Sequence, residues 1–290
     1  GDFAGLGVPI VLETFGHGSP ERDLPWVPRD VLGAVWPAVL ERYPTRASFG
    51  ASSVPEILKE VVPKPQPLRV TTLDSVALWN RGDHWVVQPL PARAQEAPVF
   101  GVVAADFNGD GKEDLFLAQN SAGAPGTNDR TDAGAGLVLV GDGRGGWSPL
   151  SVQASGIRVH GEQRAAAAAD YDADGRVDLV VTQNGDSTRL FRNMGGRPGV
   201  EVRFRGPPGN PTGIGVRVRA MDASGNAGPA REIRAGSGYW SQDSAVLVFA
   251  GERLPTALEV RWPGRQAIQF PIPSGGTMIE VSADGVMAPK

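Results

Sequence analysis

Two copies of an aspartate-rich segment, 64 residues apart, constrain the fold more than any other feature of this sequence. The first copy is Asp106–Asp114 followed by Leu115–Asn120, and the second is Asp170–Asp178 followed by Leu179–Asn184. Seven of the 15 positions are identical, which marks the two segments as one repeated unit. Apolar runs flank each aspartate-rich segment, so each copy is expected to form a strand, a loop and a second strand.

The repeated unit is predicted to contain about four short strands. This follows from the glycine-rich turns at Gly141–Gly146 and Asn193–Gly196, which lie between or after further apolar runs. A third, degenerate copy opens the chain at Gly1–Gly7, with Ala4 and Leu6 where the other copies have metal-binding side chains. We expect this copy to form a loop without a metal.

An insertion of about 40 residues is expected in the first unit, because the degenerate copy lies that much further from its neighbour. Residues 28–62 have apolar side chains at helical spacing, and Ser53 with Glu56 forms a capping box. Pro37 and Pro44 favour short, broken helices over one rod. The side chains expected to share one helical face are Val31, Leu32, Val35, Val39 and Leu40.

The repeated loops have the pattern of a calcium site. Oxygen-bearing side chains occupy the first, third and fifth positions, and a glycine at the sixth permits a sharp turn. The backbone carbonyl of the seventh residue and the carboxylate of the ninth are expected to close the shell. An EF-hand would need Glu at position 12, where this chain has Leu117 and Val181. The predicted ligands are Asp106, Asn108, Asp110, Lys112 and Asp114, and Asp170, Asp172, Asp174, Arg176 and Asp178, with Lys112 and Arg176 binding through their carbonyls.

Two calcium ions per chain are therefore expected, each in a loop between strands. The alternative is that Asp and Asn merely form turns, and the two copies in register favour the metal. The role of the ions is expected to be structural, because several acidic oxygens held close together repel one another without a cation.

Beyond about residue 200 the repeat stops, and strand-like runs alternate with turns of the Gly, Pro and Asn-Gly type. This predicts a separate all-β domain over residues 200–290, a small sandwich or barrel, after a repeat domain over residues 1–199. The strongest strand signals are at residues 216–219, 246–249, 258–262 and 277–281.

Composition excludes several classes of function. The 28 basic and 32 acidic residues give a net charge of −4, so no basic field is available to bind nucleic acid. The chain has no cysteine, which excludes disulfides and thiolate chemistry. No apolar run approaches the roughly 20 residues of a transmembrane helix, and the sequence as read from Gly1 does not open with a basic-then-apolar leader. The expectation is a soluble mature protein or a piece of one.

The loops resemble those of the FG-GAP or VCBS repeat family, whose members are β-propeller blades with calcium in exposed loops. The C-terminal region resembles the ASPIC/UnbV family at Gly213–Val218, Gly236–Gln242 and Leu258–Gly264. Repeats followed by an ASPIC/UnbV domain are the arrangement of the cartilage-acidic-protein-like proteins, and the helical insert is similar to their bacterial branch. The resemblance implies an exported, calcium-binding protein with no catalytic residues to transfer.

The expected fold is mainly β: a partial β-propeller of about three four-stranded blades with a short helical insert, then a small all-β sandwich or barrel. Propellers of this family have about seven blades. The chain is therefore either part of a longer protein or an open propeller whose edges another chain covers, because open edge strands favour aggregation.

Other motifs have simpler explanations. The GxGxxG match at Gly141–Gly146 precedes a strand and not a helix, so a hairpin turn is expected. Arg81–Asp83 has the sequence of the tripeptide that integrins recognise, but it is expected in a hairpin turn, and the turn is the preferred interpretation. Ser237 has no GxSxG context. The three histidines, which show no zinc-binding spacing, are His17, His84 and His160.

The function predicted from these features is a non-enzymatic, calcium-binding interaction module of an exported protein. Its location is expected to be extracytoplasmic, that is periplasmic, cell-surface or secreted, with a protein partner and possible association with a membrane complex. The first alternative is carbohydrate binding through Tyr239, Trp240 and Gln242, because aromatic faces beside amides suit sugar rings. The second alternative is a calcium-dependent lyase or hydrolase.

Overall fold

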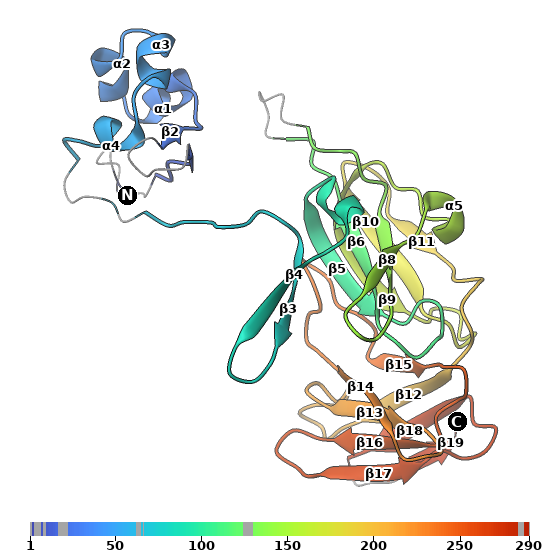
Figure 1. Ribbon diagram of the computed structural model, residues 1–290. Coiled ribbons are helices and arrows are strands. Elements are labelled where there is room, and N and C mark those ends of the chain that lie inside the picture. The colour runs from blue at the N-terminus through green and yellow to red at the C-terminus, as the bar shows by residue number, and fades with distance from the viewer. Residues whose placement is uncertain are drawn as a thin grey trace. The chain divides into compact units, whose positions relative to one another are not determined.

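The computed structural model divides into two compact units, Gly1–Leu73 and Asp74–Lys290, which are described separately. It is mainly β, with several small sheets and few helices (Figure 1). The residues that the structure describes are 2, 7, 10–16, 23–61, 65, 67–123, 130–283 and 287–289.

The first unit contains the expected helical segment. Four short helices follow a two-stranded ribbon: β1 (Thr14–Phe15), β2 (Leu24–Pro25), α1 (Arg29–Val35), α2 (Ala38–Arg42), α3 (Arg46–Gly50) and α4 (Val54–Ile57). The capping box is confirmed, because the Ser53 N–H donates to Glu56 Oε2 at 2.8 Å at the start of α4. Pro37 caps α2 and separates it from α1.

The expectation of one shared helical face was wrong. Leu32 and Val39 lie in the core of this unit with Tyr43, Phe49 and Ile57. The chain turns at Trp36 and Pro37, so the two helices do not continue one face. The side chains that are exposed instead are Val31, Val35 and Leu40.

The second unit opens with a hairpin and a four-stranded antiparallel sheet. The expected hairpin around Asn80–Asp83 is confirmed. In the sheet, each strand pairs with the next, and Ala105 lies opposite Asp114 at the end where the first aspartate-rich loop connects two strands. The elements are β3 (Val76–Asn80), β4 (Trp85–Pro89), the 3-10 helix η2 (Ala92–Gln95), β5 (Val99–Ala105), β6 (Asp114–Gln119), β7 (Leu137–Gly141) and β8 (Trp147–Pro149).

The second repeat forms a smaller sheet than expected. After α5 (Val152–Ser155), strands β9 (Glu162–Ala169), β10 (Asp178–Asn184) and β11 (Arg189–Phe191) make a three-stranded antiparallel sheet. The next strand of the chain pairs elsewhere, in the C-terminal sheets, so no fourth strand is added to this sheet in the described part of the chain. The two repeat sheets share one core, built around Val103, Phe116, Val138, Leu179 and Val181.

The C-terminal region forms two four-stranded sheets around one core, as expected for a small β-sandwich. One sheet has the order β15-β12-β18-β19 and the other β14-β13-β16-β17; only β12 and β18 pair in parallel among the strands of these two sheets. The strands are β12 (Val200–Arg205), β13 (Arg217–Met221), β14 (Ala227–Glu232), β15 (Val246–Phe249), β16 (Ala257–Arg261), β17 (Ala267–Pro271), β18 (Met278–Ser282) and β19 (Met287–Pro289).

This core is strongly apolar. It contains Val202 and Ile279 from the first sheet and Val218, Leu258 and Phe270 from the second, and each of these side chains is buried. No propeller is identified among the described residues. None of the described helices is long and apolar enough to cross a membrane.

Candidate metal centre

The predicted ligands lie in two loops that connect the first and second strands of the two repeat sheets. Loop 1 is Asp106–Asp114, between β5 and β6, and loop 2 is Asp170–Asp178, between β9 and β10. In loop 1 the first aspartate folds the turn back on itself. Asp106 Oδ1 accepts the Asp110 N–H at 3.0 Å, and Asp106 Oδ2 accepts the Gly111 N–H at 2.9 Å.

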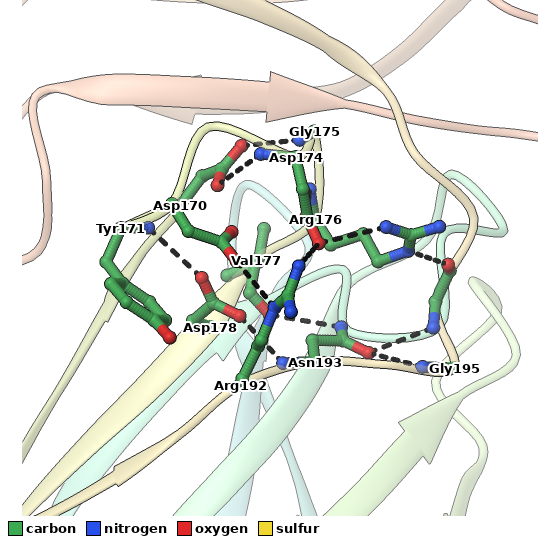
Figure 2. A network of polar contacts seen from close by, with 12 residues as sticks. Asp170, Tyr171, Asp174, Gly175, Arg176, Val177, Asp178, Arg192, Asn193 and Gly195 are labelled. Carbon is green, nitrogen blue, oxygen red and sulfur yellow. Dashed lines mark hydrogen bonds and ion pairs between the residues drawn. The ribbon is translucent and has the colours of Figure 1, made fainter.

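Loop 2 repeats these two bonds. Asp170 accepts the N–H groups of Asp174 at 3.1 Å and Gly175 at 2.7 Å, as Figure 2 shows. In both loops the backbone N–H of the seventh residue also donates to the carboxylate of the fifth residue. Lys112 donates to Asp110 and Arg176 donates to Asp174, each at 3.0 Å. The sequence repeat therefore specifies one backbone turn, built twice.

The backbone of both loops enters the left-handed region at the fourth and sixth positions. In loop 1 these are Gly109 and Gly111, with φ of 71° and 86°. In loop 2 they are Ala173 and Gly175, with φ of 58° and 80°. Ala173 is strained, because a side chain disfavours this region by roughly 1–2 kcal/mol.

The degenerate copy at the start of the chain keeps one of these bonds. The Gly7 N–H donates to Asp2 Oδ2 at 2.8 Å, and Gly7 has a φ of 75°. Asp2 and Gly7 correspond to the first and sixth positions of the loops. Ala4 and Leu6, on which the expectation of a metal-free loop depends, lie outside the described residues.

The ninth residue of each loop is a buried aspartate that accepts hydrogen bonds from its own loop and from a later turn of the chain. Asp114 accepts the Phe107 N–H at 3.0 Å, the Asn108 N–H at 3.3 Å and the Gly141 N–H at 2.9 Å. Burial raises the pKa of Asp114 to about 6, although these three donors lower it. An adjacent cation would favour the charged form of this carboxyl group.

Asp178 has the equivalent role in loop 2. Its carboxylate accepts the Tyr171 N–H at 3.0 Å and the Asn193 N–H at 2.7 Å. Burial raises its pKa as well. Asn193 also donates to the carbonyls of Phe107, in loop 1, at 2.7 Å and Val177 at 3.1 Å, so one side chain joins both loops. Sequence reasoning placed Asn193 only in a glycine-rich turn.

Three carboxylates of loop 2 converge. Ligand oxygens of Asp170, Asp172 and Asp174 all lie within 4.8 Å of one another. Hard divalent cations such as calcium bind carboxylate and carbonyl oxygens, so the chemistry of this donor set fits calcium. Loop 1 has Asn108 at the third position, and its Oδ1 accepts the Asp110 N–H at 2.8 Å.

Basic side chains offset part of this negative charge. Arg192 Nε lies 2.5 Å from Asp172 Oδ2. Arg192 also bonds to Asp174 at 3.2 Å, as Figure 2 shows. Desolvation alone would raise the pKa of Asp174, but hydrogen bonds from Arg176 and Arg192 hold it below its usual value. The seventh residue of each loop also pairs with the fifth: Arg176 Nη1 lies 3.0 Å from Asp174 Oδ2, and in loop 1 Lys112 Nζ lies 3.1 Å from Asp110 Oδ2. Arg192 was not foreseen, because it follows β11 and not the loop.

A buried acid from the C-terminal sandwich lies near loop 2. Glu201, on β12, is 6% exposed, and it lies close enough to Asp170 for the two acids to interact electrostatically. Burial raises the pKa of Glu201, and the negative charge of Asp170 raises it further. No signal in the sequence near Glu201 indicates this proximity, because the two residues lie in different sheets and different predicted domains.

Both loops pack against the segment that leads into β12. The Arg197 N–H donates to the Asn108 carbonyl at 3.1 Å, and the Gly199 N–H donates to the Gly175 carbonyl at 2.7 Å. A cavity of about 360 Å³ adjoins the loops, and its lining includes Asp106, Asp170, Arg231 and Asp243. Loops 1 and 2 therefore lie where the repeat sheets meet the sandwich.

The other motifs lie in turns, as expected. Gly141–Gly146 is a hairpin turn between β7 and β8, with the Asp142 N–H donating to the Gly146 carbonyl at 3.0 Å. Arg81–Asp83 is in the β3–β4 turn. Ser237 Oγ accepts the Asp243 N–H at 2.8 Å within a tight turn. His17 lies outside the described residues, and His84 and His160 lie in different parts of the second unit.

Comparison with known protein families assigns the C-terminal part of the chain. Residues 206–285 match the family model described as ASPIC and UnbV. The match spans most of the sandwich, from the turn after β12 to the end of β18, so the chain carries an ASPIC/UnbV domain. No curated protein matches the chain significantly.

Proposed function

We propose that this chain is a non-enzymatic, calcium-binding interaction module of an exported protein. Calcium stabilises loops 1 and 2, and the β surfaces bind another protein. The observation that carries the proposal is the convergence of Asp170, Asp172 and Asp174 in a turn whose hydrogen bonds recur in loop 1. An extracytoplasmic location follows, because calcium at that side is plentiful enough to fill such sites.

The repeat sheets support the assignment of residues 1–199 to FG-GAP/VCBS-type blades and of residues 200–290 to the ASPIC/UnbV-like domain. The β5–β8 sheet is a four-stranded antiparallel meander, the form of a propeller blade. In both repeat sheets the acidic loop connects the first two strands. The partial propeller is part of this proposal.

Thermal unfolding with and without calcium tests the proposal. Binding to the native state alone stabilises a protein by about 2.7 kcal/mol per site when the free ion is at 100 times its Kd. The melting temperature should therefore rise clearly in millimolar calcium and fall in chelator, and the D172N/D174N double variant should lose part of the rise. A melting temperature that does not change with chelator would contradict the proposal.

The β3–β4 hairpin supports a protein partner. Leu78, Trp85 and Val87 lie on one face of the hairpin, and all three are exposed. A two-stranded hairpin is only marginally stable when one apolar face is open to water. Protein isolated gently from its source in millimolar calcium should have a native mass well above 30.5 kDa. A lone particle of that mass would contradict partner binding.

A second candidate function, carbohydrate binding, is favoured by one turn of the sandwich. Trp240 is 88% exposed with a φ of 49°, and its ring lies 6.4 Å from that of Tyr239, which is 54% exposed. A strained residue that holds an aromatic ring in water suggests binding. Affinity electrophoresis against a polysaccharide panel tests this, with Trp240→Ala as the control. Unretarded migration on every gel would rule out this candidate.

A further inference from the structure

A cavity of about 360 Å³ lies within the second unit, where the two repeat sheets meet the sandwich. Strands β5 and β9 line it from the repeat sheets, and β14, β15 and the segment between these two strands line it from the sandwich. Its volume is at the lower end of the range of roughly 300–1,000 Å³ that is usual for small-molecule sites. A small ligand therefore fits the cavity by size.

One wall of the cavity is apolar although water reaches it. Along β5 exposed and buried side chains alternate, and the exposed set is Phe100, Val102 and Ala104. An antiparallel strand with one face in water normally has polar side chains on that face. Val102, which is 45% exposed, and Ala104 both line the cavity. They form a contact surface for an apolar group of a ligand.

Most charged groups of the cavity lining already have partners within the protein. Glu113 pairs with Arg231 at 2.5 Å, and Glu232 pairs at 3.1 Å with Arg217, which is not part of the lining. The first aspartates of loops 1 and 2 also line the cavity, and both oxygens of each accept N–H groups of their own loop. None of these groups needs a ligand to satisfy its charge.

Two charged groups of the lining, one of each sign, have no ion pair in the part of the chain that the structure describes, and they are Asp243 and Arg234. Asp243 Oδ1 accepts the Ala168 N–H at 2.8 Å, which fixes the carboxylate and leaves Oδ2 for another donor. Ser237 lies three residues after Arg234, and its Oγ accepts the Asp243 N–H at 2.8 Å. The cavity therefore combines one anionic group, one cationic group and an apolar wall.

We propose that this cavity binds a free α-amino acid with an apolar side chain. The ammonium group of the ligand donates to the Asp243 carboxylate, and the ligand carboxylate accepts from the Arg234 guanidinium. The apolar side chain of the ligand lies against Val102 and Ala104. Hydrogen bonds between charged groups are the strong ones, and a zwitterion makes one of each kind here. An amine or an acid alone would leave one charged group of the cavity without a partner.

Calorimetric titration of the intact chain with L-leucine, in millimolar calcium, tests the proposal. One leucine per chain should bind in a saturable manner. Three comparison ligands each lack one part of leucine: isoamylamine has no carboxylate, isocaproate has no amino group, and glycine has no side chain. Each should bind roughly tenfold or more weakly than leucine, because each loses one of the three contacts.

Two variants assign the contacts to residues. Asp243→Asn keeps an acceptor for the Ala168 N–H and should weaken leucine roughly tenfold or more, while the affinity for isocaproate stays as it was. Arg234→Gln should weaken leucine by a similar factor and leave isoamylamine unchanged. The control variants are Glu252→Gln and Arg253→Gln, which change exposed charges of the β15–β16 turn outside the cavity lining and should leave every affinity unchanged.

The results that would overturn the proposal are equally specific. Absence of saturable leucine binding up to millimolar concentration would overturn it and leave the proposed calcium sites as they were, because the inference does not depend on calcium binding. Leucine affinity that is unchanged in both variants would place the ligand outside this cavity. If Asp243→Asn weakened isocaproate as strongly as leucine, Asp243 would hold the fold and not the ammonium group of the ligand.

Discussion

Loops 1 and 2 share one backbone turn, but the first aspartate of each loop has a different charged neighbour. In loop 1 the first aspartate, Asp106, lies near the positive charge of Arg231. In loop 2 its counterpart, Asp170, lies near the acid Glu201. The repeated sequence specifies the turn, whereas distant parts of the chain determine the charge around it. We therefore expect loop 2 to depend more strongly on a cation than loop 1.

The largest effect is expected from exchanging the fourth residues of the two loops, starting with Gly109→Ala. A Cβ at Gly109 would lie 2.5 Å from the Arg197 carbonyl oxygen and 2.6 Å from its nitrogen, at a φ of 71°. Backbone atoms cannot move aside cheaply, so the free energy of unfolding should fall by about 2–4 kcal/mol. Urea unfolding in calcium measures this. A loss below about 0.5 kcal/mol would show that loop 1 does not pack against residue 197.

A smaller effect is expected from removing the basic side chain that competes with calcium in loop 2. Arg192→Gln removes the ion pair of Asp172 and one of the two ion pairs of Asp174, which keeps its pair with Arg176. A charge about 6 Å from a divalent ion is worth about 1.4 kcal/mol in water, so calcium affinity at loop 2 should rise about tenfold.

The comparison variant in loop 1 is Lys112→Gln, which removes the lysine that pairs with Asp110. Its effect on the affinity of loop 1 should be smaller, because Lys112 pairs with one carboxylate of its loop whereas Arg192 pairs with two. Calorimetric titration of both variants checks the comparison. Unchanged or weaker calcium binding in Arg192→Gln would show that the arginine does not compete with the ion.

The smallest effect is expected from the reciprocal exchange, Ala173→Gly in loop 2. Ala173 is exposed and has a φ of 58°, so glycine relieves strain without removing a buried contact. The net gain in stability should be about 0.5–1 kcal/mol, because glycine also increases the entropy of the unfolded chain. A rise in melting temperature supports the shared-turn account. A fall would mean that the left-handed conformation is not retained at this position.

The sequence predicted correctly several features that are formed by residues close together in the chain. The two loops, the β3–β4 hairpin and the capping box at Ser53 each depend on residues close together in the chain, and each forms as expected. The helical segment was also predicted, but not its buried face. The turn at Pro37 changes which side chains of α1 and α2 point inward.

What the sequence did not reveal depends on pairing between distant segments. The alternating pattern of Val200–Arg205 predicts a strand but not its neighbours. That strand joins β15 and β18, so the second repeat sheet has three strands and not four. The same pairing brings Glu201 to Asp170, and no local pattern distinguishes such an acid from one that faces water.

The most direct test of the account is a calcium titration of the intact chain by calorimetry, with magnesium as the control ion. The account predicts two calcium ions per chain, and one in the D172N/D174N variant. Magnesium should bind more weakly, because it demands a smaller and more regular shell. Absence of saturable calcium binding up to millimolar concentration would contradict the central claim that these repeated loops are calcium sites.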